Sequence, residues 1–335
     1  MVLQNTKGFG PVVAAVGGNF FVTILKFIAA FASGSSSMLS EAVHSLADTI
    51  NQVLLLIGLQ RSTKKADDEF GYGYGRERFF WALISACGVF FVGAGVTAYH
   101  GVTAIMSPHQ IEFSLIVFVV LFAAFIIEFY TFWVAASALR KDFPTATWSE
   151  RISEADPSTL AVFLEDLVAV VGIFVASVSI TLTYLTHNAI WDAMGSLIIA
   201  FLLATVAITL IIKNRSYLLG RAVPENVREG VIELLNTEPS IEKVIDFKSS
   251  AVAFGMYRIK CEVEFNGSAL LAETHQMENL TSEFEDIQSD FEAFKRFCVD
   301  FADRIPRLIG RKIDEIESRI KKQYPSIRHI DIEVN

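Results

Sequence analysis

Six apolar stretches, each long enough to cross a lipid bilayer, constrain this chain more than any other feature of its sequence. Crossing about 30 Å of hydrocarbon takes about 20 helical residues. The stretches occupy residues 11–33, 37–60, 79–106, 111–138, 159–186 and 190–213. We therefore expect a polytopic α-helical membrane protein with six transmembrane helices.

Charged residues are distributed unevenly along the chain. Asp, Glu, Lys and Arg number 26 in residues 1–213 and 39 in residues 214–335, which is about 12% and 32% of the two parts. This split predicts a transmembrane domain over residues 1–213 and a water-exposed domain over residues 214–335. The net charge of −9 is shared by both parts. A chain with no basic face is a poor partner for nucleic acid, and we exclude that function.

The loops between the apolar stretches are of two kinds. Those at 34–37, 107–110 and 186–188 are short and carry no Lys or Arg, whereas the other loops are basic. Lys and Arg are enriched in cytoplasmic loops. We therefore expect both termini to be cytoplasmic, in the inner membrane of a bacterium or in an organelle membrane of a eukaryote. The first stretch lacks a signal-peptide cleavage pattern, and we expect it to be retained.

Residues 214–335 have the pattern of a small α/β domain. Residues 224–236 predict a short amphipathic helix that begins with Pro224 in its first turn. Apolar and charged residues alternate over 257–265 and again at 330–334, which predicts strands, and a further strand is expected near 243–254. The order helix, strand, strand, helix, strand suits a small sheet covered on one face.

An acidic helical insert is predicted at about residues 268–304. Its apolar residues recur at alternating spacings of three and four, which is the seam of a heptad repeat. They are Met277, Leu280, Phe284, Ile287, Phe291, Phe294, Cys298 and Phe301. Pro306 should end or kink this helix, with a second helix after it. The seam is compatible with a coiled coil or dimer contact, but we favour an amphipathic helix packed on its own domain.

Placing an ionisable residue inside a membrane costs free energy, so each such residue is a candidate for a functional role. The second apolar stretch contains Glu41, His44 and Asp48, and their spacings of three and four place them on one stripe of a helix. Asn51 extends the stripe by one turn. One helix therefore presents a line of oxygen and nitrogen ligands.

The fifth apolar stretch adds Glu165 and Asp166. Neighbouring residues on a helix point about 100° apart, so we expect only one of them to face the stripe on the second stretch. Imidazole and carboxylates bind divalent transition metals, and Zn, Mn, Fe and Co all suit them. The competing interpretation is a set of buried ion pairs and interhelical hydrogen bonds, in which Lys26 neutralises a carboxylate. Glu128, in the fourth stretch, fits either a metal path or such a hydrogen bond.

Such a site would couple metal to protons. Several carboxylates held together in a medium of low dielectric repel one another when they are ionised and empty. Protons relieve this repulsion, and a divalent metal must displace those protons in order to bind. We therefore expect metal and protons to be exchanged, through alternating access to a fixed site.

Several motifs resemble those of the cation diffusion facilitator family. They are residues 19–26, GSSSMLSEAVHSLAD at 34–48, YGYGR at 72–76, Asp166 followed by Gly172, and DAMGSLIIA at 192–200. Members of this family are six-helix metal/proton antiporters, usually homodimers, with a ferredoxin-like cytoplasmic domain. The resemblance implies these properties here, together with zinc efflux. Within the family the sequence is most like the zinc transporter nine branch, through residues 40–48, 156–159 and 164–166 and the lengthened tail.

The resemblance also assigns the metal ligands residue by residue. His44, Asp48 and Asp166 carry over from the family. Relatives dedicated to zinc often have a second His four residues before the Asp that corresponds to Asp166. This chain has Val162 at that position. Either Glu41 or Glu165 can replace that missing ligand.

A second metal site found in some relatives is not expected in this chain. Phe70 and Tyr74 occupy the places of its histidines in the loop after the second stretch. Asp67 and Asp68 alone would bind a metal weakly.

These expectations combine into one function. The chain should be a transporter and not an enzyme, exchanging a divalent transition metal, Zn²⁺ first, for protons and exporting it from the cytoplasm. No cofactor is expected beyond the transported metal. The alternative is a membrane-anchored interaction or regulatory protein that acts through its cytoplasmic domain.

Overall fold

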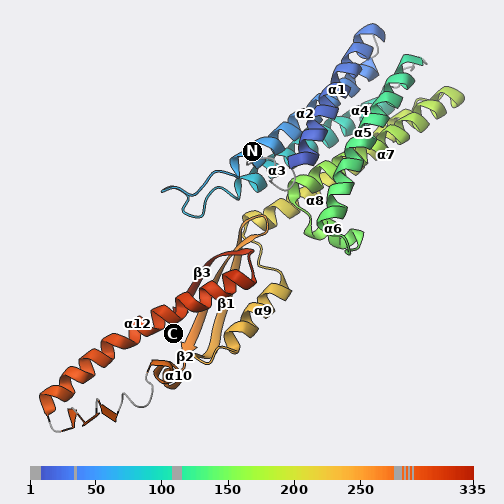
Figure 1. The fold of residues 1–335 in the computed structure, drawn as a ribbon. Coiled ribbons are helices and arrows are strands. Elements are labelled where there is room, and N and C mark those ends of the chain that lie inside the picture. The colour runs from blue at the N-terminus through green and yellow to red at the C-terminus, as the bar shows by residue number, and fades with distance from the viewer. Residues whose placement is uncertain are drawn as a thin grey trace. The chain divides into compact units, whose positions relative to one another are not determined.

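The computed structural model describes residues 9–33, 36–107, 115–274, 281–282, 284–285, 287–288 and 290–335. The chain divides into two compact units, one up to Leu219 and one from Gly220 onward (Figure 1). The last helix of the first unit continues to Leu218, a few residues beyond the predicted domain boundary at residue 213. Each unit has its own core and is described by itself.

The first unit is a bundle of helices that run side by side (Figure 1). A helix occupies each of the six predicted apolar stretches, and residues 77–106 form one continuous segment with a π-helical turn, η2, in its middle. The elements are α1 (Phe9–Ser33), α2 (Ser36–Arg61), α3 (Glu77–Gly88), η2 (Val89–Ala94), α4 (Gly95–Met106), α5 (Leu115–Asp142), α6 (Trp148–Glu154), α7 (Pro157–Thr186) and α8 (Ile190–Leu218).

Within the described part of the chain, four helices are long and apolar enough to cross a membrane. They are Glu77–Met106, Val119–Asp142, Pro157–Thr186 and Ile190–Leu218. α1 contributes a shorter apolar stretch, Val16–Ile28. α2 is less apolar because buried polar side chains, including Asn51 and Gln52, follow one of its faces. Four of the six predicted spans therefore have the length and composition of membrane helices.

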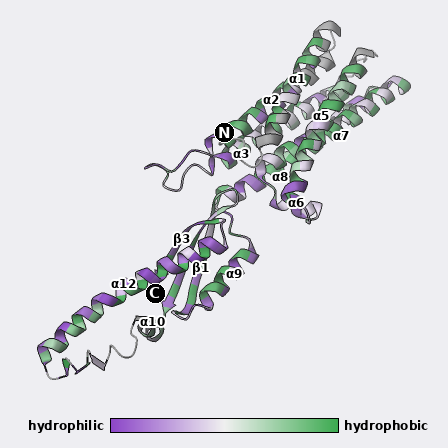
Figure 2. Cartoon of the chain, viewed as in Figure 1, coloured by the Kyte–Doolittle hydropathy of each residue, from purple (hydrophilic) through white to green (hydrophobic). Residues whose placement is uncertain are grey.

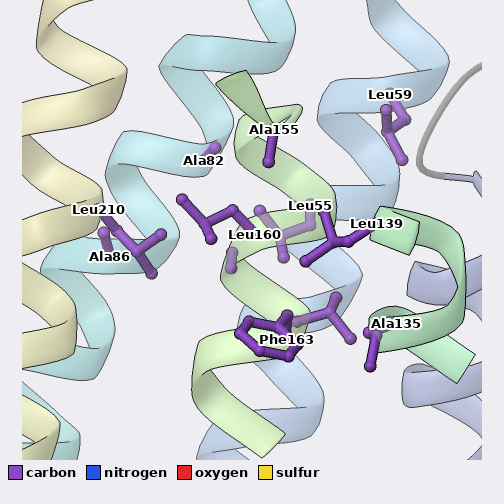
Figure 3. Packing of buried hydrophobic residues seen from close by; sticks show 13 residues of the cluster. Leu55, Leu59, Ala82, Ala86, Ala135, Leu139, Ala155, Leu160, Phe163 and Leu210 are labelled. Carbon is purple, nitrogen blue, oxygen red and sulfur yellow. The ribbon is translucent and has the colours of Figure 1, made fainter. Parts of the chain in front are cut away.

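An apolar core joins α2, α3, α5, α7 and α8. Figure 3 shows the side chains of Leu55, Leu139 and Leu160 meeting at its centre, with alanines on the adjoining helices. Small residues allow helix backbones to approach closely in a membrane. Rings extend the core, because Phe163 of α7 stacks on Phe132 of α5 and on Trp148 of α6, with centroids 5.3 and 5.8 Å away.

The π-helical turn η2 packs against α7 and α8. Val89 and Ala94 form a cluster with Val168 of α7 and with two residues of α8, Leu203 and Ala207. Glycine permits a further close contact between α7 and α8. A Cβ added to Gly195 would lie 2.2 Å from Oγ of Ser179, so no larger residue fits there without movement.

The second unit contains a three-stranded mixed sheet among its described residues. β1 pairs antiparallel with β2, and β2 pairs parallel with β3, in the order β1-β2-β3. The predicted order of helix, strand, strand, helix and strand is present. The elements are α9 (Glu225–Asn236), β1 (Ile241–Ala253), β2 (Met256–Phe265), α10 (Gly267–Thr274), α12 (Phe291–Gln323) and β3 (Ile327–Val334).

One face of this sheet is covered by α9 and the second half of α12. The alternation predicted for β2 holds, because Ile259, Cys261 and Val263 are buried against Ile316 and Ile320 of α12. A buried ion pair supports the same contact. Glu238, which follows α9, lies 3.3 Å from Nζ of Lys312 and also pairs with Arg319, both on α12.

The helix prediction around Pro306 is wrong in one respect. α12 begins at Phe291, where Asp290 caps it, and runs through Pro306 to Gln323 as one helix. Pro306 removes one backbone hydrogen bond, but packing of the following turns on the sheet holds the helix together. The first half of the predicted seam, 277–290, lies largely outside the described residues. The favoured interpretation stays a prediction for residues 291–306, where Ala293, Phe297, Phe301 and Ile305 are half-buried and the other side chains are exposed. Apolar and hydrophilic residues alternate along this half of α12 (Figure 2).

Candidate metal centre

Four carboxylates from three helices lie in the interior of the first unit. Glu128 of α5 and the adjacent Glu165 and Asp166 of α7 are buried, and Asp48 of α2 is half-buried. α2 and α7 pack against each other, as do α5 and α7. The carboxylates that the sequence singles out on separate helices therefore belong to one region of the bundle.

Asp166 is the member of this group with the most connections. The side chain of Thr131 on α5, whose hydroxyl donates to the backbone oxygen of Glu128 at 3.0 Å, interacts with Asp166, and charge interactions link Asp166 to Glu128, Glu165 and Asp48. Oδ2 of Asp166 is buried and has no hydrogen-bond partner among the described residues. One oxygen is thus oriented by the protein while the other remains available to a ligand.

Glu165 is buried as well, although it precedes Asp166 directly. Both of its carboxylate oxygens lack a hydrogen-bond partner within the part of the chain that the structure describes. A charge interaction connects it to Asp48. An ionisable group buried without a partner is costly. A proton or a cation at this position would reduce that cost.

Polar side chains of α1 lie beside the carboxylates. With its amide nitrogen toward α5, Asn19 donates to both carboxylate oxygens of Glu128 at 3.2 Å, and its oxygen accepts from Nε2 of Gln52 at 2.7 Å. Glu128 therefore forms an interhelical hydrogen bond, which is one of the two roles predicted for it from the sequence.

Lys26 lies two helical turns further along α1 and does not extend to the bundle surface. It is buried, and its Nζ donates to Oγ of Ser45 on α2 at 2.7 Å. Between these contacts the hydroxyls of Thr23 and Thr49 lie 3.2 Å apart. A continuous line of polar contacts thus joins α1 to α2.

Asn51 takes part in helix packing rather than in the carboxylate group. Its Oδ1 would lie 2.7 Å from a Cβ added to Gly88 of α3, and its backbone oxygen accepts from Oγ of Ser85 at 3.2 Å. The glycine is therefore what admits this amide between α2 and α3.

Two of the predicted ligands cannot be placed in full. Glu41 and His44 lie in α2, but their side chains are outside the described part of the structure. Among the side chains that are described, no three His, Cys, Asp or Glu residues come close enough together to hold a metal ion. The assignment of His44, Asp48 and Asp166 as ligands, with Glu41 or Glu165, stays a prediction.

A buried ion pair closes the end of the bundle where α3 and α7 begin. Arg78 and Asp156 are both buried, and their side chains are 2.6 Å apart. Oδ2 of Asp156 also accepts from the backbone nitrogen of Thr159 at 3.2 Å and so caps α7. The helix that carries Glu165 and Asp166 is in this way fixed to α3.

The loop after α2 has no arrangement of ligands around Asp67. Oδ2 of Asp67 accepts from Nζ of Lys64 at 2.7 Å and from the hydroxyl of Tyr74 at 2.8 Å. Lys64 and the backbone N–H of Phe70 lower the pKa of Asp67 to about 2. This carboxylate is ionised at neutral pH and already paired.

Three residues of the polar interior were not singled out from the sequence as functional. Asn19 lies four residues before Thr23, and Thr23 lies three residues before Lys26. Gln52 follows Asp48 by four residues. The same helical spacing that revealed the ligand stripe of α2 would have revealed them. Their uncharged side chains gave no comparable reason to ask why they lie in a membrane.

Comparison with known proteins shows which family the transmembrane helices belong to. The family model of the cation efflux transmembrane domain matches residues 12–219. The proton-coupled zinc antiporter SLC30A9 of Homo sapiens is 35% identical over 98% of this chain, which spans 59% of the length of that relative. Metal tolerance protein C4 of Arabidopsis thaliana is 32% identical over 97% of this chain and 73% of its own length.

A more distant relative shares most of its length with this chain. The uncharacterized transporter MJ0449 of Methanocaldococcus jannaschii is 24% identical over 80% of this chain and 89% of its own length. The match of the family model over residues 12–219 covers more than half of the chain and includes all four interior carboxylates. The chain therefore belongs to the cation efflux family, the cation diffusion facilitators, as its helix motifs predicted.

Proposed function

We propose that this protein is a secondary transporter that exchanges a divalent transition-metal ion, Zn²⁺ first, for protons and exports it from the cytoplasm. Relatives with 32 to 35% identity are named proton-coupled zinc antiporters, which supports the choice of zinc and of protons. The metal is the cargo, and no resident cofactor is proposed.

The observation that carries this proposal is the buried and unpartnered state of the α7 carboxylates. Both oxygens of Glu165 and Oδ2 of Asp166 are removed from solvent without a hydrogen-bond partner among the described residues. Asp48 interacts with both by charge. A purely structural ion-pair network would satisfy these oxygens with donors.

We infer a ligand set of His44, Asp48 and Asp166, with Glu165 in preference to Glu41 as the replacement for the missing nitrogen ligand. Burial and the charge interaction with Asp48 support Glu165. Metal binding requires ionised carboxylates and neutral imidazole, so loading metal releases protons, and protonation releases metal. The exchange follows from this competition.

The finer architecture is also proposed. α1 and α2 would complete six membrane spans, with both termini in the cytoplasm, and the C-terminal sheet with α9 and α12 on one face would be a ferredoxin-like domain. We further propose a homodimer. The helix positions support the six membrane spans, and the order of the strands supports the ferredoxin-like domain.

Metal uptake into proteoliposomes tests the function directly. We expect zinc to move when a proton gradient is applied, with an opposite pH change reported inside the vesicles. Asp48→Asn, Asp166→Asn and His44→Ala should abolish both signals, and Glu165→Gln should weaken them strongly. Mn²⁺, Fe²⁺ and Co²⁺ supplied in parallel would define the preferred cargo.

A matched control removes a carboxylate elsewhere. Asp68 is exposed in the loop after α2, and Asp68→Asn should transport as the wild type does. Zinc movement without an opposite pH change would overturn antiport. Normal transport by Asp166→Asn would overturn the site.

A further inference from the structure

α12 carries one apolar stripe along its whole length, but among the described residues only its second half is buried against the sheet and α9. Ile316 and Ile320 are buried on the sheet and on α9, and Leu308 is buried nearer the middle of the helix. Phe294, Cys298 and further apolar residues continue the same stripe toward the start of the helix at spacings of three and four. In Figure 1 this first half of α12 runs on past the end of the sheet.

The uncovered half of the stripe consists of large apolar side chains in solvent. Phe291 is 69% exposed and Phe294 is 48% exposed, and Cys298 is exposed between them and Phe301. Large apolar groups gathered on one helix face mark a contact surface. In residues 291–306 only Ala293, Phe297, Phe301 and Ile305 are half-buried, and every other side chain is exposed.

Charge identifies the occupant of this surface. Charged residues follow the helix in alternating pairs: acidic, basic, acidic and basic. They are Asp290 and Glu292, Lys295 and Arg296, Asp300 and Asp303, and Arg304 and Arg307. The pattern reverses its sign about a point beside Cys298. Within one chain these groups pair along the helix, Lys295 with Glu292, Arg296 with Asp290 and Arg307 with Asp303. An antiparallel second copy centred beside Cys298 also sets acidic turns beside basic turns.

We propose that residues 291–305 of α12 pair in antiparallel orientation with the same segment of a second copy of this chain. The contact is isologous, and Cys298 lies next to its twofold axis. This deepens the homodimer that forms part of the proposed function and rests on it. The acidic insert thereby acquires a role as a dimer contact.

A lipid surface fits the same helix face less well. Helices that lie on membranes carry mainly Lys and Arg on their polar face. Here acidic and basic residues are equal in number over residues 290–307, so attraction to anionic lipid is weak. The self-complementary order of charges favours a second copy.

Thiol cross-linking of the full-length protein in detergent tests the contact. Copper phenanthroline should convert the wild type to a disulfide-linked dimer, and Cys298→Ser should abolish this product. Cys261 will not interfere, because it is fully buried and burial raises the pKa of its thiol to about 12. A wild type that elutes as a dimer but gives no cross-link through Cys298 would overturn the proposal.

The orientation is tested by moving the thiol of α12 in a background in which Cys87 is replaced by Ser. In Phe291→Cys/Cys298→Ser, an antiparallel pair separates the two new thiols by about 20 Å along the helices, and no cross-link should form. Efficient cross-linking of this variant would mean a parallel pair and would overturn the antiparallel arrangement.

Disruption of the stripe gives a second measurement. Phe294→Asp should lower the dimer fraction in size-exclusion chromatography with light scattering by about tenfold or more, for about 1.4 kcal/mol of lost affinity. Val334→Asp is the matched control, because Val334 is equally exposed, at 50%, but lies on β3. An unchanged dimer fraction in Phe294→Asp would refute the role of this helix face in dimerisation. A monomeric wild type would refute the dimer itself. Zinc transport in vesicles tests the proposed function separately.

Discussion

Two adjacent carboxylates of α7 have different surroundings at the scale of single residues. Asp166 has one oxygen held by Thr131, while Glu165 has no hydrogen-bond partner in the described structure. A ligand whose orientation is fixed in advance binds metal more tightly than one that must be ordered on binding. Asp166 is therefore the oriented member of the pair and Glu165 the adaptable one.

Thr131→Val should reduce the affinity for zinc while leaving the fold intact. It removes the hydroxyl that orients Asp166 at nearly constant volume, and losses of such outer contacts cost about 10–100-fold in metal affinity. The measurement is the zinc concentration for half-maximal transport. Thr183→Val is the matched control, because the Thr183 hydroxyl is buried on α7 with no hydrogen-bond partner among the described residues. Equal affinities in the two variants would show that Thr131 has no such role.

Asp156→Asn should destabilise the first unit. Asparagine can still cap α7, but Arg78 would be left buried without its counter-charge, which costs about 3–5 kcal/mol. The melting temperature in detergent should fall accordingly. The double variant Arg78→Met/Asp156→Asn should recover much of the loss, since it leaves no uncompensated charge. A double variant less stable than either single one would contradict this account.

At the scale of elements, close contacts between helices depend on particular glycines. α7 and α8 meet at Ser179 and Gly195, and α2 and α3 meet at Asn51 and Gly88. Because cores of this kind are closely packed, an added methyl group has nowhere to go without displacing a neighbour. These glycines determine how near the helices can approach.

Gly195→Ala should therefore lower stability by about 1–3 kcal/mol. Its Cβ would lie 2.2 Å from Oγ of Ser179, and Ser179→Gly in the same chain should restore part of the loss. Gly17→Ala provides the control, because nothing lies within 4 Å of a Cβ there. That variant should be neutral or up to about 1 kcal/mol more stable. Thermal unfolding in detergent distinguishes these outcomes.

At the scale of the whole molecule, the chain contains two units with separate apolar cores. Among the described residues, the core of the C-terminal unit is built from α9, the sheet and α12. It needs no residue from the membrane unit to fill it. Each unit should thus fold by its own interactions.

A fragment of residues 220–335 should therefore fold in water and unfold cooperatively. Circular dichroism should show helix and strand, and denaturant should give a single transition. Ile316→Ala should lower the free energy of unfolding by about 2–5 kcal/mol, because Ile316 is fully buried. Val334→Ala, at an exposed position, should change it little. A fragment without a cooperative transition would contradict the independence of the unit.

Much of this architecture follows from sequence periodicity alone. Long apolar stretches and strict alternation report burial directly, so the six long helical segments of the bundle and the strand β2 were predicted to within a few residues, whereas the short helix α6 was not. The path of α12 through Pro306 was not, because packing on the sheet outweighs a local preference and is invisible in the sequence. The site was predicted from charged residues, whereas the hydrogen bonds of Asn19 and Thr131 depend on which helices are neighbours.

The π-helical turn at Val89–Ala94 bears on how sequences of this family are aligned. Hydrogen bonds from i to i+5 accommodate one more residue than an α-helix needs to keep the same faces in contact. Ser85 and Gly101, on either side of the turn, both face neighbouring helices. A relative with an uninterrupted α-helix here should be one residue shorter between these two positions. An alignment that allows no gap there would pair lipid-facing residues with packed ones.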